Sequence, residues 1–384
     1  MEERLVITNC RLFDEQGERT VSVHIEDGVI ARISQTESIA TCESVLDAQG
    51  RIIAPGFIDI HIQGAGGADI LDGTVDGLRA ISRTCARFGT TSFLATTVFK
   101  PGRKNEHLAL TAENVGRDLG GANLLGIHLE GPFISLQKKG MILPECICRP
   151  SVQVLDEILG ITNGRLKIMT IAPELPESLS IIRSLVASGV VASFGHSNAT
   201  YEQTLEGFDA GISHVTHLFN AMPSVHHRDP GPLVAILQTE SVTAQLITDG
   251  VHIHPAVLRL AFETLGQGRS IPITDGMQAI GFGDGKFVYN GVEYESRQGV
   301  ARYKDGTLIG TALGLSQMLG RFIAFTNCPL EVAVKTVTEN PAELLGLQDR
   351  KGTIAPGKDA DLILLDDDLS VHTTIVGGRI VFRK

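Results

Sequence analysis

The sequence repeats one pattern eight times, a short apolar run rich in β-branched residues followed by a stretch with helical periodicity. Strands buried on both faces read as continuous apolar runs, and parallel strands of this kind are joined by helices. Eight such units in succession predict an α/β fold, a (β/α)8 barrel of the TIM type. The predicted strands are 57–62, 90–98, 124–130, 167–173, 190–196, 212–218, 243–249 and 270–275.

The two ends of the chain differ from this middle part. Both contain short alternating strands separated by turn signals such as Glu26-Asp27-Gly28. We therefore predict a small β-sandwich domain built from residues 1–54 and 352–384, with the barrel in residues 55–351. Residues 276–312 are glycine-rich and strand-like, and they predict an insertion near the mouth of the barrel.

Charge and cysteine content limit the possible partners and compartments. The net charge is −11, with no block of lysines or arginines, which argues against nucleic acid or an anionic membrane as the main partner. The six cysteines form no regular framework, as is typical of reduced thiols in a cytoplasmic protein. The charged, alternating N-terminus resembles neither a signal peptide nor a membrane span.

Polar residues close several of the predicted strands, and in a barrel these strand ends meet at one mouth. Glu130, His196 and His217 supply a carboxylate and two imidazoles, the ligand set of a catalytic site for a divalent ion. Such an ion lowers the pKa of water toward neutrality. Asp275 is placed to accept the proton of that water and later to donate it to a leaving group.

Other polar residues near these ends have weaker assignments. His61 and Gln63 end the first predicted strand. The remaining expectations are that His128 lies beside the ligands, His214 is structural, Asp59 orients a neighbouring group and Asp249 caps a turn.

Seven segments together resemble the successive motifs of the N-acetylglucosamine-6-phosphate deacetylases of the amidohydrolase superfamily. They are "PGFIDIHIQGAGG", "HLEGPF", "GHSNAT", "THLFNAMP", "HHRDPG", "DGVHIHP" and "ITDGMQA". The closing segment "TENPAELLGLQDRKGTIAPGKDADLILLD" is similar as well, so the resemblance covers nearly the whole chain. The N-acetylgalactosamine-6-phosphate deacetylases share most of these motifs.

The resemblance implies a metal-dependent barrel that converts N-acetylglucosamine 6-phosphate into glucosamine 6-phosphate and acetate. It agrees with Glu130, His196 and His217 as metal ligands and with Asp275 as the catalytic carboxylate. The positions that match those holding the sugar phosphate are Asn220, Ala221, Arg228 and His252. The ion implied is zinc, and iron, cobalt and manganese also suit this ligand set. Members are commonly homodimers in which the loop of Arg228 reaches the neighbouring site.

Two positions depart from the family pattern. Members with two metals carry His-x-His on the first strand, whereas this chain has His61 and Gln63. A glutamine offers only a neutral carbonyl, so we expect one firm ion, with any second ion at His61 and Gln63 weak or absent. Ile142 matches a His or Gln that polarises the substrate carbonyl, and losing such a donor typically costs about 2.7–4 kcal/mol.

These departures leave alternatives to the main prediction. The substrate could be the galacto epimer, or another N-acyl or cyclic amide hydrolysed by the same fold. The metal alone, or Lys139, could replace the function lost at Ile142. A different class of function is a non-catalytic protein that binds a metal and a sugar phosphate.

Overall fold

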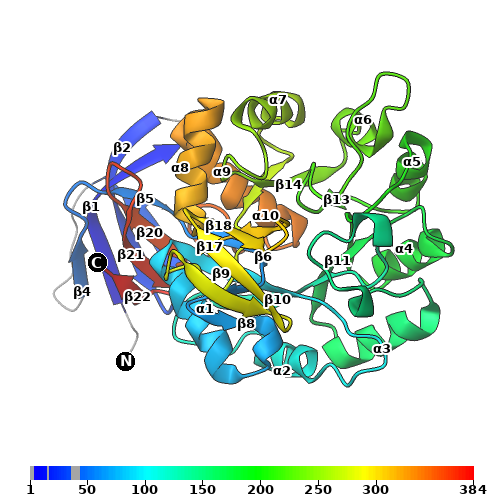
Figure 1. The fold of residues 1–384 in the computed structure, drawn as a ribbon. Helices are drawn as coiled ribbons and strands as arrows, with labels where there is room; N and C mark the ends of the chain where they lie inside the picture. Colours follow the sequence, from blue (N-terminus) through cyan, green and yellow to red (C-terminus); the bar gives the residue numbers. More distant parts are fainter. Residues whose placement is uncertain (1–3, 15–16, 36–43) are drawn as a thin grey trace.

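The computed structural model describes residues 4–14, 17–35 and 44–384, and its centre is an eight-stranded parallel barrel (Figure 1). The first and last barrel strands meet through a parallel bridge between Ile62 and Gly276, which closes the barrel. The predicted (β/α)8 fold is therefore confirmed. In spatial order the strands are β6 (Phe57–Ile62), β9 (Thr90–Thr97), β10 (Asn123–Glu130), β11 (Leu166–Ile171), β12 (Val191–Phe194), β13 (His214–Val215), β14 (Thr243–Ile247) and β15 (Ser270–Ile273).

Helices follow the barrel strands and bury apolar faces against them. The sequence determines where α1 starts, because Thr74 Oγ1 accepts a hydrogen bond from Gly77 N at 3.1 Å and so caps the helix. The helices are α1 (Val75–Arg87), α2 (Glu106–Asn114), α3 (Val152–Thr162), α4 (Ser178–Ala187), α5 (Tyr201–Asp209), α6 (Gly231–Gln238), α7 (Pro255–Leu265), α8 (Leu315–Thr326), α9 (Leu330–Val337) and α10 (Glu339–Leu344). Short elements at the strand ends are β7 (Gly64–Ala65), β8 (Ala68–Asp69), η1 (Ile70–Asp72), η2 (Leu136–Lys138) and η3 (Pro144–Cys146).

Strands from both ends of the chain form the predicted small β-domain. Its eight strands belong to one sheet in the order β22-β21-β20-β5-β1-β2-β3, with β4 paired to β1. The two ends join where Leu362 pairs with Pro55 and Leu365 with Ile52. The domain limits at residues 54/55 and 351/352 stay a prediction. The strands are β1 (Arg4–Asp14), β2 (Gly17–Glu26), β3 (Val29–Ser34), β4 (Ser44–Asp47), β5 (Ile52–Pro55), β20 (Leu362–Leu365), β21 (Val371–Val376) and β22 (Arg379–Arg383).

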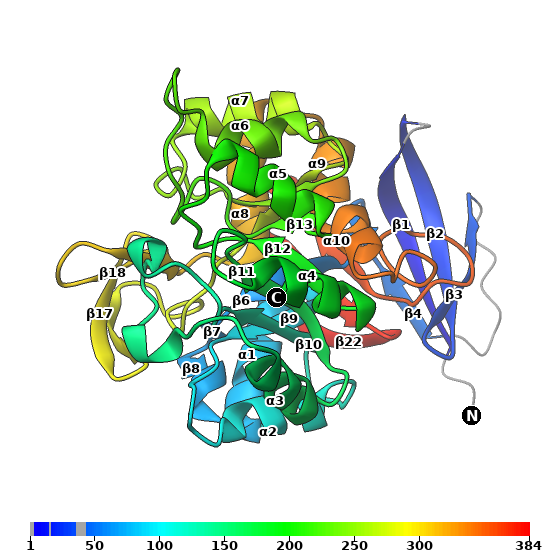
Figure 2. The ribbon, with the colours of Figure 1, turned by 90° about the vertical axis from the view of Figure 1, so that its right-hand side faces the viewer.

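The segment predicted as an insertion forms a four-stranded antiparallel sheet between β15 and α8. It projects on the side of the barrel away from the small domain (Figure 2). Its strands are β16 (Gly285–Tyr289), β17 (Val292–Arg297), β18 (Val300–Tyr303) and β19 (Leu308–Thr311). We refer to residues 276–312 as the excursion.

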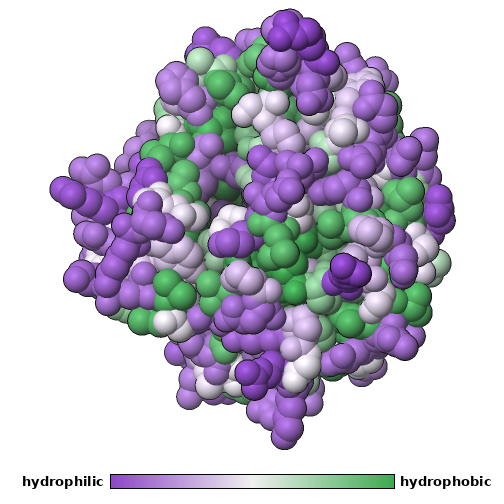
Figure 3. Space-filling view, turned by 45° about the vertical axis from the view of Figure 1, so that its right-hand side comes forward, coloured by the Kyte–Doolittle hydropathy of each residue, from purple (hydrophilic) through white to green (hydrophobic). Residues whose placement is uncertain are grey.

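The surface is mixed in character. Figure 3 shows one face, on which hydrophobic residues gather around a central recess while hydrophilic residues occupy most of the rim. None of the helices within the described residues is both long and apolar enough to cross a lipid bilayer. The cysteines described by the structure, Cys10, Cys85, Cys146, Cys148 and Cys328, are free thiols, and Cys42 lies outside the described residues.

Candidate metal and catalytic site

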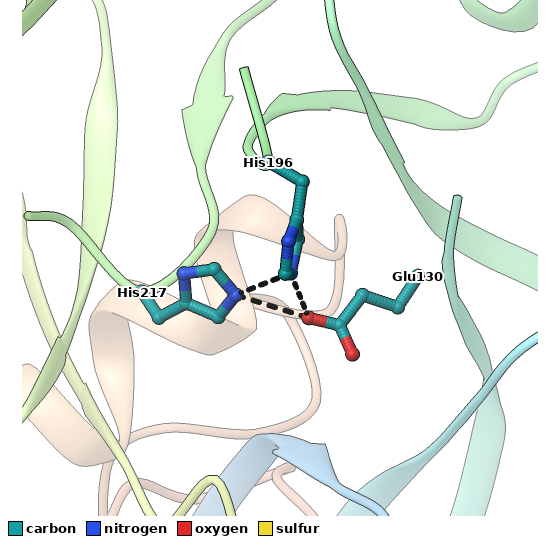
Figure 4. A group of neighbouring side chains, drawn as sticks. All are labelled: Glu130, His196 and His217. Atoms are coloured by element: carbon teal, nitrogen blue, oxygen red, sulfur yellow. Dashed lines mark hydrogen bonds and ion pairs between the residues drawn. The ribbon is translucent and has the colours of Figure 1, made fainter. Parts of the chain in front are cut away.

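Three buried side chains converge at the mouth of the barrel (Figure 4). Glu130 Oε1 lies 2.8 Å from His196 Nε2 and 3.0 Å from His217 Nε2. The two Nε2 atoms lie 3.0 Å from each other, so three potential ligand atoms face one point. The structure thus brings together the residues that the sequence predicts as metal ligands.

Close packing of neighbouring strands places these groups. Glu130 is the last residue of β10, and His196 follows β12 after a single glycine, Gly195. A Cβ atom at Gly195 would lie 2.7 Å from Thr170 Cγ2 and 2.9 Å from Thr216 Cβ. Only glycine therefore fits between β11 and the residue after β13, and this close packing places His196 at the mouth of the barrel.

Backbone strain marks the same positions. His196, His217 and Asp275 have φ values of 47°, 30° and 46°, a left-handed region that side chains other than glycine rarely occupy. Strained residues of this kind persist where the surrounding structure holds them and cluster at functional sites. Each of the three turns away from its strand in this way.

The donor atoms fit a divalent ion. His196 Nδ1 donates to the carbonyl oxygen of Lys138 at 2.8 Å, which leaves the Nε2 lone pair directed at the cluster. Burial alone would raise the pKa of Glu130, but the two imidazoles beside it, His196 and His217, hold it well below its usual range. Among the described residues, Glu130 Oε2 and His217 Nδ1 are buried without a partner. A buried carboxylate with two imidazoles is the donor set that zinc and related ions take in hydrolases.

Asp275 lies beside this cluster. Gln63 Nε2 donates to Asp275 Oδ1 at 3.0 Å and lies 3.2 Å from His61 Nε2. His61 Nε2 is itself 3.2 Å from Asp275 Oδ1 and 3.9 Å from Glu130 Oε1. The amide nitrogen of Gln63, rather than its carbonyl, thus faces the site, and its Oε1 has no partner within the described chain.

Gln245 on β14 is a site residue that the sequence reasoning missed. Its Oε1 accepts hydrogen bonds from His61 Nδ1 at 2.9 Å and from His217 N at 3.2 Å. The available signal was a lone polar residue in the apolar run "TAQLITD". Gln245 fixes the tautomer of His61, because the Nδ1 proton is committed to it.

The other polar residues have supporting contacts. Asp59 Oδ1 accepts from His61 N at 3.2 Å, and burial raises the pKa of Asp59 to about 7. His128 bonds to the Ile60 carbonyl oxygen at 2.9 Å and, through Nε2, to Thr170 Oγ1 at 2.9 Å, so both its nitrogens are engaged. Burial first, and then His61, holds the pKa of His128 well below its usual range. His214, with Nδ1 2.7 Å from Thr243 Oγ1, lies outside the ligand cluster.

The residues expected at the sugar phosphate occupy the loops after β13 and β14. Asn220 and Ala221 follow His217 closely in the chain, and Ala221 has a φ of 54°. Asp249 Oδ2 accepts from His252 Nδ1 at 2.7 Å, while its Oδ1 caps the turn by accepting from His252 N at 2.8 Å. Burial would raise the pKa of Asp249, but the bonds from His252 lower it overall. His252 is thus held by a charged partner.

The described hydrogen bonds of Arg228 lie within its own loop. Arg228 is exposed, and its Nη1 lies 2.8 Å from His227 Nε2. The loop that carries it precedes α6 and projects from the body of the molecule (Figures 1 and 2).

Ile142 lies in an apolar cluster rather than in a polar subsite. Only 1% of its surface is exposed, and it belongs to a cluster with Ile134, Met277 and Tyr289. The cluster joins the loop after β10 to the excursion. The half-buried Lys139 lies nearby in sequence, and its Nζ is 3.4 Å from the carbonyl oxygen of Gly140.

Residues 52–381 match the Amidohydrolase family. The chain is 38% identical to N-acetylglucosamine-6-phosphate deacetylase of Bacillus subtilis (strain 168), over 94% of this chain and 92% of that protein. The chain belongs to the N-acetylglucosamine-6-phosphate deacetylase family of amidohydrolases. It is therefore an enzyme that hydrolyses amide bonds, and amidohydrolases depend on a metal ion.

Other members of this deacetylase family extend the comparison. N-acetylgalactosamine-6-phosphate deacetylase of Escherichia coli O157:H7 is 34% identical over 93% of this chain and 94% of that protein. An Asp-to-Ala variant of N-acetylglucosamine-6-phosphate deacetylase from Mycobacterium smegmatis, solved with N-acetylglucosamine 6-phosphate, superposes with a TM-score of 0.90. It shares 31% identity, and the match covers 99% of each chain.

Proposed function

We propose that this amidohydrolase removes the acetyl group of N-acetylglucosamine 6-phosphate to give glucosamine 6-phosphate and acetate. The observation that carries the proposal is the convergence of Glu130, His196 and His217 on one point, with Asp275 beside them. The names of its relatives supply the substrate class.

Glu130, His196 and His217 would hold one divalent ion, with zinc our first choice and iron, cobalt or manganese as alternatives. When bound, such an ion supplies a Lewis acid for the amide carbonyl and lowers the pKa of water. Asp275 then takes the proton from the attacking water and later delivers it to the nitrogen of the leaving amine. The described contacts of Gln63 and His61 both fall on Asp275 Oδ1, so Oδ2 remains to face the water.

We assign Gln63 to positioning Asp275 rather than to a second ion. Its donating amide nitrogen points at Asp275 and His61, and a donor cannot ligate a cation. A second ion at His61 and Gln63 is accordingly weak or absent.

Asn220, Ala221 and His252 would bind the sugar phosphate from within the chain. Arg228 is exposed on a projecting loop, which fits a role in the site of a neighbouring subunit. A planar guanidinium is suited to phosphate oxygens. We therefore propose a homodimer in which each Arg228 completes the other site. The free thiols fit a cytoplasmic enzyme.

Ile142 contributes packing and no hydrogen bond to the substrate. Because Ile142 lies in the apolar cluster, it helps to pack the loop after β10 against the excursion. Relatives are expected to carry a hydrogen-bond donor at this position instead. A second candidate substrate is N-acetylgalactosamine 6-phosphate, because a relative 34% identical to this chain carries that name.

Acetate release tests the proposal. Purified protein is assayed with both N-acetylhexosamine 6-phosphates, and its metal content is measured on the same sample. We expect turnover of the gluco compound with about one ion per chain. Turnover of the galacto compound alone would favour the second candidate. No release from either, with zinc, iron or manganese added, would refute the substrate assignment and favour a non-catalytic binding protein or another amide substrate.

A further inference from the structure

A cleft of about 490 Å³ opens outside the cluster of Glu130, His196 and His217. It lies between the β7–β8 hairpin, the end of β9 and the excursion. The side chains that characterise it are Asp69, Lys100, Gln278, Phe287 and Asn290. None of them belongs to the metal cluster or to the expected phosphate subsite, which sits on the loops after β13 and β14.

Buried acceptors without partners line this cleft. Asp69 is 4% exposed and Gln278 is 8% exposed. Asp69 Oδ1 accepts from Leu71 N at 2.8 Å, but within the described residues Asp69 Oδ2 and Gln278 Oε1 have no partner. A buried acceptor left unpaired costs free energy, so these two oxygens favour a ligand that brings hydrogen-bond donors or a positive charge.

A cation stands at the same cleft without pairing to Asp69. Among the ion pairs of the described residues none joins Lys100 to Asp69, although the charge of Lys100 acts to lower the pKa of Asp69 while burial, the larger effect, raises it to about 7. The backbone of Lys100 is fixed, because its N–H donates to Asn105 Oδ1 at 2.8 Å and its carbonyl oxygen accepts from Asn105 Nδ2 at 3.0 Å. One cleft therefore offers a buried carboxyl group and a half-exposed ammonium group that form no ion pair with each other.

We propose that this cleft binds an amino-sugar phosphate, with the ligand ammonium at Asp69, its hydroxyls at Gln278 and its phosphate at Lys100. The choice of ligand rests on the proposed function, since the hydrolysis converts a neutral amide into such an ammonium compound. The substrate lacks the positive charge that Asp69 requires. The cleft is thus a site for the product in preference to the substrate.

The cleft is connected to the catalytic carboxylate. Ile70, next to Asp69, donates through its N–H to the carbonyl oxygen of Gln63 at 2.9 Å. Gln63 Nε2 in turn holds Asp275 Oδ1 at 3.0 Å. Gln278 follows Asp275 by three residues. A ligand that shifts the Asp69 segment therefore acts on the group that holds Asp275.

Calorimetric titration of the metal-loaded enzyme with glucosamine 6-phosphate tests the proposal. We expect two binding sites per chain, one at the metal and one in the cleft. Asp69→Asn keeps a capping oxygen and removes the charge, so it should leave one site. Asp76→Asn makes the same charge change on an exposed residue and should retain two. Lys100→Gln should lower the affinity of the cleft for glucosamine 6-phosphate at least tenfold. His252→Ala changes the other site and should leave the binding that depends on Asp69 unchanged.

Glucose 6-phosphate, which has a hydroxyl in place of the amine, should fail to fill the cleft. A single site in the wild type overturns the proposal, as do two sites that persist unchanged in both Asp69→Asn and Lys100→Gln. Acetate release measured on the same samples separates the two hypotheses. If acetate is released but only one glucosamine 6-phosphate site is found, the cleft proposal is wrong and the proposed reaction is supported. If no acetate is released but binding depends on Asp69, the proposed reaction is wrong and the cleft proposal is supported.

Discussion

Asp275 Oδ1 receives a hydrogen bond from Gln63 at 3.0 Å and lies 3.2 Å from His61 Nε2. The hydrogen bond from Gln63 restricts how this carboxylate can turn, and general acid–base catalysis needs the proton-transfer group in a fixed position. The roles of Asp275 and Gln63 can be tested by changing one side chain at a time.

Replacing Asp275 with asparagine should lower kcat by about 10²–10⁴-fold, because an amide cannot accept and return the proton. The metal content and the binding of substrate should stay the same, since Glu130, His196 and His217 are untouched. Acetate release, metal analysis and calorimetric binding measure the three quantities. Full activity in Asp275→Asn would mean that another group moves the proton.

Replacing Gln63 with histidine should raise the metal content from about one toward two ions per chain. An imidazole would replace the donating amide next to His61, and imidazole is the better ligand for transition metals. Gln63→Leu is the matched control and should remain at one ion. A Gln63→His protein that still holds one ion would show that His61, tied to Gln245, is unable to act as a ligand.

Three barrel strands, β12, β13 and β15, end earlier than the sequence predicts, and each of them ends two residues before a site residue. Residues 212–218 read as one strand, yet only His214–Val215 pair, and β12 stops at Phe194. The reason is that His196, His217 and Asp275 adopt positive φ, which breaks the ladder and aims the side chain into the mouth. Apolar periodicity reports burial and therefore predicts the strands, but it carries no signal for this turn.

The site itself was only partly predictable. The convergence of Glu130, His196, His217 and Asp275 could be predicted because each closes or follows an apolar run, and all barrel strands open at one mouth. The donor role of Gln63 and the part of Gln245 could not, because they depend on which distant atom each amide faces. The packing of Ile142 could not be predicted either, because it depends on contacts with the distant excursion.

The close packing of the strand ends also limits which residues can replace Gly195. In Gly195→Ala the added Cβ would lie 2.7 Å from Thr170 Cγ2, so the strands must separate, and we expect a loss of about 1–3 kcal/mol in the free energy of unfolding. His196 would move with its strand, and metal affinity should fall. Urea unfolding measures the first effect and metal titration the second.

Gly160→Ala is the control for this experiment. Gly160 lies inside α3, and no neighbouring atom comes within 4 Å of the place that an added methyl group would take. Alanine should therefore be neutral there or stabilising by up to about 1 kcal/mol. Equal stability of the Gly195→Ala protein and the wild type would show that the barrel accommodates the methyl group.

At the scale of the whole molecule, one buried charge cluster joins the barrel to the small domain. Lys351 is 8% exposed and contacts both Asp361 and Asp359, the latter at 3.0 Å. The backbone carbonyl oxygen of Asp361 accepts a hydrogen bond from Gly56 N at 2.8 Å, and its carboxylate Oδ1 accepts one from Gly377 N at 2.8 Å. Lys351 therefore neutralises the carboxylate of a residue whose backbone and side chain together link Gly56 to Gly377.

Lys351→Met should lower the free energy of unfolding by about 3–5 kcal/mol, because it leaves buried carboxylates without a counter-charge. Arg350→Met is the matched control, since Arg350 also contacts Asp359 at 3.0 Å but is 69% exposed, and it should change stability by about 0–1 kcal/mol. Denaturant unfolding of both variants provides the comparison. Similar losses in the two would argue against the Lys351 cluster as the stabilising contact.

The pairing of β5 with β20 has a consequence for synthesis on the ribosome. Leu362 adds to the edge formed by Ile52–Pro55 only after the entire barrel has been translated. Until then β5 has an unpaired edge, and such edges invite association with other chains. Domains generally fold in order as they emerge, but here the first strands to be made must wait for the last. Nascent chains stalled before residue 362 should therefore be the form of this protein most dependent on chaperones.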